Sequence, residues 1–287
     1  MKPIFQKMLV IGVGLIGGSL ALASRRKGLI EKVYGMGRSA DSLQRALDLG
    51  VIDGMPKDLK EGLDRTDLVV LGTPVGKFEE WARSLSQQVN EGLIVTDVGS
   101  VKGKLVIQLE EILKGKASFV GGHPIAGKEK SGVEASQESL FEGALCVLTP
   151  TPRTAPEALQ KVKSLWEGVG SKVALVDPFV HDRLLAAVSH LPHMVAYALV
   201  NAVLDADIEG HDPISFSGGG FRDFTRISAS SEEMWRDICL QNKEALVEML
   251  EVYQEKIGDI KQLIINEDGE GLLQTFRRAK GVKKRIA

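Results

Sequence analysis

Short apolar runs alternate with amphipathic segments through the first 177 residues of the chain. The runs rich in β-branched residues predict strands at residues 7–13, 32–36, 67–71, 93–96, 118–120, 145–148 and 172–176. The segments between them have apolar residues at helical spacing, which predicts helices at residues 15–27, 39–49, 77–88, 101–113 and 155–167. Such alternation is typical of parallel βαβ units, so we predict a doubly wound parallel sheet.

The pattern changes at Asp177-Pro178, after which strand signals disappear. Long helical patterns occupy residues 181–204, 231–257 and 259–279. The chain is therefore predicted to divide into an α/β domain, residues 1–177, and an all-helical domain, residues 178–287.

One predicted helix has about the length and apolar character of a membrane span. Residues 184–204 contain no acid, Lys or Arg, but they include Ser189, His190, His193 and Asn201. Because polar groups are costly in lipid, we expect instead a helix buried in a protein core or a dimer.

The composition is that of an ordinary globular protein. With 44% hydrophobic residues and a formal net charge of −2 over 287 residues, the chain gives no sign of a nucleic-acid or membrane partner. Cys146 and Cys239 lie far apart in apolar contexts, which suits free thiols in a reducing compartment. No signal peptide is visible in the first residues, so a cytoplasmic location is expected.

A glycine-rich turn follows the first predicted strand and opens the first predicted helix, the context in which a G-x-G-x-x-G string indicates dinucleotide binding. The first glycine permits the tight turn, the second lets the backbone approach a pyrophosphate, and the third lets helix and strand pack closely. The helix N-terminus offers N–H groups to the anion. We predict a Rossmann-type domain in which the cofactor contacts Gly12, Val13, Gly14, Leu15, Ile16 and Gly17.

The end of the second predicted strand indicates which dinucleotide is used. An acid there would bind the adenosine 2′-hydroxyl and repel a 2′-phosphate, but the chain has Arg38 and Ser39. These residues can accept a 2′-phosphate, so NAD is expected with NADP possible. The alternative is that Arg38 faces solvent.

Two further strand ends place small residues where a cofactor ring would approach. Thr73 and Pro74 follow one strand, and Gly99 and Ser100 follow another. Gly99 and Ser100 can also be read as a plain turn and a helix N-cap.

Three histidines are candidates for chemistry. His123 lies between Gly-Gly and Pro, which predicts a rigid loop at the carboxyl edge of the sheet where an imidazole can take a proton from an alcohol. His190 and His193 are three residues apart and share a helix face. A metal site is the alternative there, but no Cys or carboxylate cluster accompanies them, so we predict no metal.

An arginine pair follows a triple glycine at residues 218–220. Arg222 and Arg226 share a face if the segment is helical, and the guanidinium group binds carboxylates through paired hydrogen bonds. Asp223 is placed to hold one of them, although a surface ion pair of little energetic value is the alternative.

Taken together, the motifs resemble those of the prephenate dehydrogenase family, whose members are also called cyclohexadienyl or arogenate dehydrogenases. The resemblance extends over almost the whole chain and rests on residues 12–20 (GVGLIGGSL), 97–102 (DVGSVK), 122–127 (GHPIAG), 189–193 (SHLPH), 221–227 (FRDFTRI) and 235–237 (WRD).

The resemblance implies an oxidative decarboxylation of prephenate or arogenate in tyrosine biosynthesis, by a homodimer with intertwined helical domains. It implies that His123 takes the proton of the ring hydroxyl, supported by Ser100, and that Arg226 binds a substrate carboxylate. It further places His193 at the other end of the substrate. Residues that it implies around the pocket are Arg222, Asp223, Trp235 and Glu129.

This chain departs from the family at Lys128, where members often carry Thr. A cation there would favour a keto acid over an acid that bears an ammonium group.

Two other functions remain open. A 3-hydroxyacid dehydrogenase or imine reductase would share the architecture but would need a catalytic Lys or Asp in its helical region. A non-catalytic dinucleotide sensor would bind the cofactor without turnover.

Overall fold

The computed structural model describes residues 2–89, 92–127 and 132–286, with side chains in the last helix up to residue 282. The chain divides into two compact units, residues 1–243 and 244–287.

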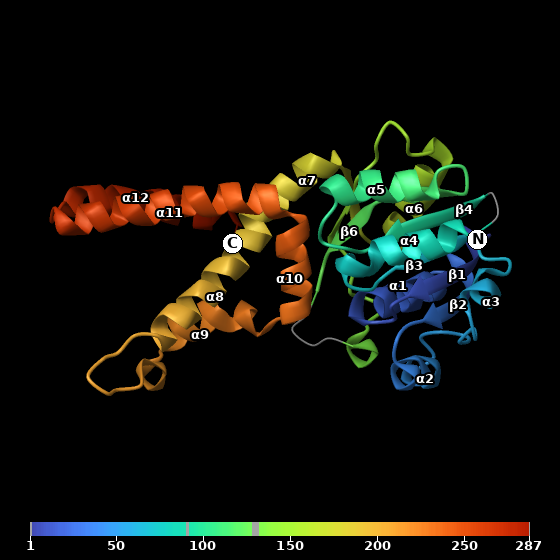
Figure 1. Cartoon of the computed structure of the whole chain (residues 1–287), viewed down its shortest axis with the longest axis horizontal. Coiled ribbons are helices and arrows are strands. Elements are labelled where there is room, and N and C mark those ends of the chain that lie inside the picture. The colour runs from blue at the N-terminus through green and yellow to red at the C-terminus, as the bar shows by residue number, and fades with distance from the viewer. Residues whose placement is uncertain (1, 90–91, 128–131, 287) are drawn as a thin grey trace. The chain divides into compact units, whose positions relative to one another are not determined.

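A five-stranded parallel sheet forms the centre of the first unit (Figure 1). The strand order is β2-β1-β3-β4-β5, so the chain moves first to one side of β1 and then to the other. All four pairings are parallel, which confirms the predicted α/β class. The strands are β1 (Phe5–Ile11), β2 (Ile30–Met36), β3 (Leu68–Leu71), β4 (Leu93–Asp97) and β5 (Ala117–Val120).

Helices cover both faces of this sheet because its strands are apolar on both sides. Met8 and Val10 of β1 face one core with α1 (Leu15–Arg26) and α6 (Pro156–Gly168). Leu9 and Ile11 face the other core with α4 (Phe78–Ser86) and α5 (Gly103–Leu113). Burial of each such side chain contributes about 1.5–3 kcal/mol to the free energy of folding. The shorter helices are α2 (Ala40–Asp48) and α3 (Leu59–Leu63), with 3₁₀ turns at Val75–Lys77, Val133–Ala135 and Pro213–Phe216.

A second, three-stranded sheet lies beside the first and corrects the expected single sheet. It contains β6 (Gly122–Ile125), β7 (Leu145–Leu148) and β8 (Lys172–Leu175). β6 runs antiparallel to β7, and β7 runs parallel to β8. The segment that carries His123 is therefore a strand rather than the predicted loop, because its backbone pairs with β7.

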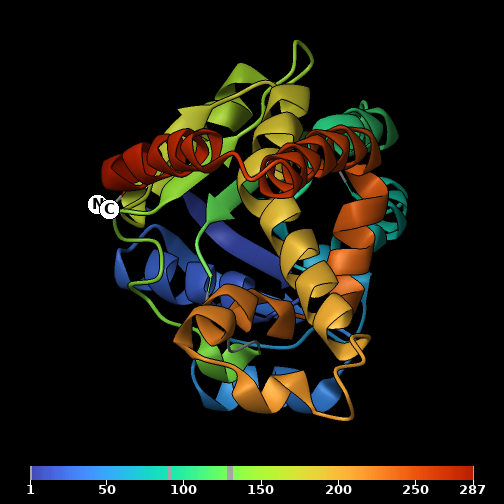
Figure 2. The ribbon, with the colours of Figure 1, turned by 90° about the vertical axis from the view of Figure 1, so that its left-hand side faces the viewer.

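The helical part of the first unit begins at Asp177, whose side chain accepts hydrogen bonds from the N–H groups of Phe179 and Val180. The predicted helix 181–204 is longer and is interrupted by a π turn at Ala186–His190, between α7 (Pro178–Leu185) and α8 (Leu191–Leu204). The last two residues of the triple glycine begin α9 (Gly219–Thr225), and Gly218 is its N-cap. A 3₁₀ turn (Arg226–Ala229) and α10 (Glu232–Gln241) come next, and α10 lies beside α8 (Figure 2).

The expected helix 231–257 breaks at Asn242, which has a non-helical backbone conformation. The Asn242 side chain donates to the carbonyl oxygen of Asp182, 2.9 Å away, so a tertiary contact explains the break.

The second unit contains α11 (Lys243–Ile265), from its second residue onward, and α12 (Gly269–Ile286). The predicted break near Gly258 is wrong, because the helix continues through that residue at a cost of only about 1 kcal/mol. The chain turns instead at residues 266–268, where Glu267 has a φ of 53° and the Asp268 carboxylate accepts from the N–H of Gly271.

The stretch Pro178–Leu204 is long and apolar enough to cross a membrane by length and composition alone. Only 11% of its most apolar window is buried within the chain, so the expectation of a core helix is wrong for the isolated chain. The expected alternative, burial of this helix in a dimer, stays a prediction.

Candidate active site

The carboxyl ends of four strands lie in one row, and the register fixes which loops become neighbours. Ile11 of β1 is opposite Met36 of β2 on one side and Leu71 of β3 on the other. Leu71 is in turn opposite Asp97 of β4. The segments that begin at residues 12, 37, 72 and 98 therefore meet at one edge of the sheet, where ligands of open α/β sheets bind.

The glycine-rich loop has the geometry that a dinucleotide requires. Gly12 has a φ of 97°, and a Cβ there would lie 2.6 Å from the backbone of Gly72 and Thr73, so only glycine fits. A Cβ on Gly14 would meet nothing within 4 Å. Tight packing around Gly12 and open space beside Gly14, the N-cap of α1, match a turn that receives a pyrophosphate at a helix N-terminus. A Cβ on Gly17 would lie 2.9 Å from a Val10 methyl group, as expected for the helix–strand contact.

Other predicted cofactor residues lie around the same edge. Thr73 precedes Pro74 directly after β3, and its buried Oγ1 has no hydrogen-bond partner among the described residues. Arg38 and Ser39 are exposed after β2, and Ser39 caps α2 by accepting from the N–H of Ser42. Residues of the glycine-rich loop, the strand ends and the exposed Arg38 thus fit a bound dinucleotide.

The loop after β4 is held by a buried ion pair that the sequence did not reveal. The Lys102 ammonium lies 2.5 Å from the Asp97 carboxylate, and both side chains are 1% exposed. Lys102 Nζ also donates to the carbonyl oxygens of Gly99 and Val101. The other Asp97 oxygen accepts from the N–H of Gly122, next to His123. This pair therefore fixes the Gly99–Ser100 turn and the start of β6 relative to each other.

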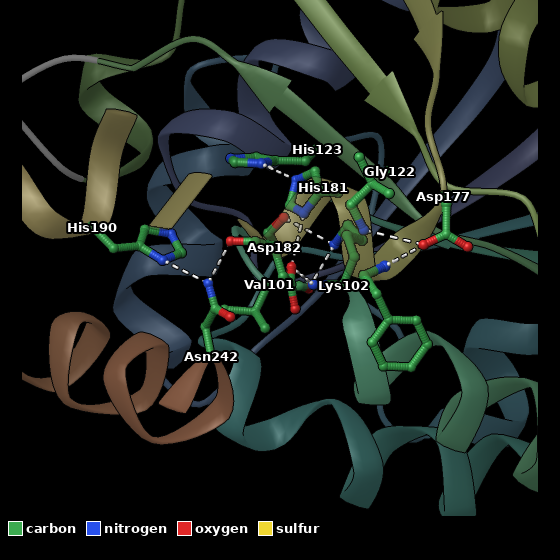
Figure 3. A network of polar contacts seen from close by, with 12 residues as sticks. Val101, Lys102, Gly122, His123, Asp177, His181, Asp182, His190 and Asn242 are labelled. Carbon is green, nitrogen blue, oxygen red and sulfur yellow. Dashed lines mark hydrogen bonds and ion pairs between the residues drawn. The ribbon is translucent and has the colours of Figure 1, made fainter. Parts of the chain in front are cut away.

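His123 is buried, and its ring belongs to a chain of hydrogen bonds (Figure 3). Its Nδ1 lies 2.9 Å from Nε2 of His181, and Nδ1 of His181 lies 2.8 Å from Oδ1 of Asp182. The same Asp182 oxygen accepts from the N–H of Lys102. Ser100 is half-buried, and among the described residues no hydrogen bond joins it to His123.

The environment keeps His123 neutral. Burial lowers the pKa of His123 well below 6.5, and the nearby His181, Lys102 and His190 lower it further by charge repulsion. Burial also lowers the pKa of His181, against the opposing effect of Asp182. A neutral imidazole is the form that accepts a proton.

His190 and His193 share a face, as expected, and both contact Trp235 of α10. The His193 ring stacks on Trp235 at 3.8 Å between centroids, and the His190 ring meets it edge-on at 5.8 Å. Trp235 also packs against Val101 in the loop after β4. Through Val101 and Lys102, this loop joins the His193–Trp235 pair to the His181–His123 pair.

Each of the two histidines makes a hydrogen bond through its Nδ1 atom. His193 Nδ1 donates to the carbonyl oxygen of Ser189, whereas His190 Nδ1 accepts from the Asn242 amide at 3.0 Å. Within the described residues no group of three or more His, Cys, Asp or Glu side chains is placed to hold a metal ion.

The arginine segment lies beside α8. Arg222 and Asp223 on α9 and Arg226 at the start of the adjoining 3₁₀ turn are exposed. Arg222 donates to the carbonyl oxygen of Ser217 at 3.2 Å. Glu129 and Lys128, the residues expected near the substrate side chain, lie outside the described residues.

Sequence reasoning missed His181, Asp182, Asp97, Lys102 and Asn242. Asp97 and Lys102 are in the motif at residues 97–102, in which only Gly99 and Ser100 were assigned to the site. For His181-Asp182, the only signal was two polar residues on the core side of an apolar helix, where burial of a charge requires a partner.

Comparison with known proteins agrees with this geometry. Residues 20–175 match the family model described as prephenate dehydrogenase, nucleotide-binding domain, and residues 177–278 match that described as prephenate dehydrogenase, dimerization domain. The prephenate dehydrogenase of Bacillus subtilis (strain 168) is 37% identical over 286 residues, which cover 98% of this chain and 76% of the relative.

Two solved structures have the same fold along nearly the whole chain. Prephenate dehydrogenase from A. aeolicus, in complex with hydroxyphenyl propionate and NAD⁺, is 44% identical with a TM-score of 0.94 and 98% coverage of both chains. Synechocystis arogenate dehydrogenase is 31% identical with a TM-score of 0.83, covering 98% of this chain and 100% of that one. With both family models matched and a relative 37% identical over 98% of the chain, the chain belongs to the prephenate dehydrogenase family.

Proposed function

We propose that this protein oxidises and decarboxylates prephenate to 4-hydroxyphenylpyruvate, arogenate to tyrosine, or both, with NAD⁺ as the oxidant and NADP⁺ as a possible substitute. The observation that carries the proposal is a buried, neutral His123 that follows Gly122, whose N–H donates to Asp97 at the carboxyl end of β4. That strand end is in the same row as the end of β1, where the glycine-rich loop begins. One relative is named a prephenate dehydrogenase and another an arogenate dehydrogenase, so experiment must decide which acid this protein prefers.

The chain's cofactor residues have distinct tasks. The N–H groups of Leu15, Ile16 and Gly17 at the start of α1 would bind the pyrophosphate, with Gly14 leaving room for it. Arg38 is placed after β2, where the adenosine ribose of a Rossmann-bound dinucleotide lies. Thr73 and Gly99 would border the nicotinamide side.

The reaction removes a hydrogen from a ring carbon that also bears a hydroxyl, and it breaks the bond to the ring carboxylate. When bound, NAD⁺ accepts the hydride from that ring carbon. His123 Nε2 takes the hydroxyl proton as the C–O bond gains carbonyl character, and it returns the proton to oxygen once CO2 has left and the ring is aromatic. A general base of this kind contributes about 10²–10⁴-fold to the rate.

The helical segments would bind the anionic ends of the substrate. Arg226 is proposed to bind a carboxylate, with Arg222 and Asp223 near it on α9. His193, stacked on Trp235, would contact the other end.

The match to a dimerization domain supports assembly through the helical part of the chain. We propose a homodimer in which the apolar surface of Pro178–Leu204, largely unburied in one chain, is covered by the partner. The functional boundary would then fall after residue 177, between a dinucleotide-binding domain and a substrate and dimerisation domain. The two free cysteines suit the cytoplasm, where we propose that the enzyme works.

The test is an absorbance assay for reduced nicotinamide with each acid and each cofactor in all four combinations. Turnover with at least one acid is expected, together with release of CO2. Binding of NAD⁺ without turnover of either acid would support a dinucleotide sensor instead. Turnover of aliphatic 3-hydroxyacids alone would indicate another class of dehydrogenase.

A further inference from the structure

The hydrogen bonds around His123 determine which of its nitrogen atoms carries the proton. A carboxylate only accepts hydrogen bonds, and Asp182 Oδ1 already accepts from the N–H of Lys102. The contact at 2.8 Å between Asp182 Oδ1 and His181 Nδ1 therefore places a proton on that nitrogen. A neutral His181 then has an unprotonated Nε2, which accepts hydrogen bonds.

The next contact extends the argument to His123. His181 Nε2 lies 2.9 Å from His123 Nδ1, so His123 must carry its proton on Nδ1. In the neutral imidazole this leaves Nε2 of His123 with a lone pair. We infer that His181, fixed by Asp182, is a positioning residue that holds His123 in the tautomer able to accept the substrate proton. This inference rests on the proposed function.

Burial makes this arrangement rigid. His181 is 0% exposed and Asp182 5% exposed, so water cannot readily replace either hydrogen bond. The two rings are 5.1 Å apart with a 66° angle between their planes, which directs the His181 lone pair at the edge of the His123 ring. The Asn242 amide donates to the carbonyl oxygen of Asp182 and so fixes the backbone of this helix turn. The arrangement serves the same purpose as the carboxylate that orients the histidine of a serine protease.

Replacement of His181 tests the inference, whereas replacement of Asp182 would also break the contact to the Lys102 backbone. In His181→Phe the His123 Nδ1–H loses its acceptor, and the tautomer with the proton on Nε2 becomes accessible. In His181→Gln the amide oxygen can still accept from His123. The matched control is His211→Gln, which changes an exposed histidine outside this network.

Steady-state kinetics should separate positioning from a purely structural role. His181→Phe is expected to lower kcat by about 10²–10⁴-fold, the range of general-base catalysis, while KM and NAD⁺ affinity change by less than about 3-fold. His181→Gln should recover most of the loss, and His211→Gln should behave as wild type. A His181→Phe enzyme with near-normal kcat, or a loss that appears in KM instead, would overturn the inference.

Nitrogen NMR of the ¹⁵N-histidine-labelled full-length protein provides a readout that does not depend on turnover. In the wild type, the His123 signals, assigned through the His123→Asn variant, should report a protonated Nδ1 and an unprotonated Nε2. A protonated Nε2 would refute the inference even if His181→Phe failed to fold. Because this measurement needs no substrate, it separates an error in the tautomer from an error in the proposed function, which the wild-type assay tests.

Discussion

Acid should destabilise the folded protein through His190. This side chain is fully buried, and burial lowers its pKa from 6.5 to about 4, against the opposing effect of Asp182 and with smaller lowering by His181 and His193. The unfolded chain therefore takes up a proton below pH 6.5, whereas the folded chain remains neutral at this position down to about pH 4. The contribution of His190 to the free energy of unfolding is fully present above pH 6.5 and decreases as the pH falls through this window.

The magnitude is set by the difference between the two pKa values. A difference of about 2.5 at about 1.4 kcal/mol for each pKa unit gives about 3 kcal/mol over the whole window. Between about pH 7.5 and about pH 4.5 the contribution is about 2.5 kcal/mol. This is a large part of the roughly 5–15 kcal/mol that typically stabilises a folded protein.

The assay is urea unfolding of the wild type and of His190→Leu at these two pH values, at one fixed protein concentration. His190→Leu also removes the acceptor of the Asn242 amide, but that cost is the same at both pH values and cancels in the difference. The wild type should lose about 2.5 kcal/mol more than His190→Leu on acidification. His211→Leu, at an exposed site, is the control and should behave as the wild type. Equal losses in the wild type and His190→Leu would refute the reasoning.

Four further predictions concern the active site and the cofactor. His123→Asn should lower kcat by about 10²–10⁴-fold with little change in substrate affinity, and a near-normal rate would remove it from the mechanism. Arg226→Ala should raise the substrate KM by about 10- to 150-fold, as loss of a charge-assisted contact predicts, and an unchanged KM would exclude a carboxylate contact. Arg38→Ala should raise the Kd of NADP⁺ more than that of NAD⁺; equal effects would mean that Arg38 does not contact the 2′-position. Gly12→Ala should lower Tm, because its Cβ would lie 2.6 Å from the backbone of Gly72 and Thr73, whereas Gly14→Ala should keep Tm and weaken NAD⁺ binding, and the reverse order would contradict the loop geometry.

The periodicity of apolar residues predicted the parallel sheet well because it reports local structure. Each strand of that sheet is apolar on both faces, and each helix has one apolar side. The glycine-rich loop could be predicted equally well. Gly12 is required by the tight turn, and Gly14 keeps the space beside that turn open. Such features depend on neighbours within a few residues in the chain.

The features that were missed depend on contacts between distant segments. β6 is a strand only because β7 pairs with it, and its sequence, Gly-His-Pro-Ile, has little strand character of its own. The helix break at Asn242 depends on Asp182, sixty residues away. His181 lies 58 residues from His123, so no local pattern could join the two rings.

The position of His123 on β6 has a consequence for how this scaffold can change. The main chain at His123 is tied to Val147 of β7 by strand pairing, so the imidazole is anchored to a part of the molecule that resists deformation. The pairing ends at Ile125, and residues 126 and 127 lie outside it. Mutations beyond Ile125 can therefore alter the following loop while the strand pairing that holds the imidazole stays intact.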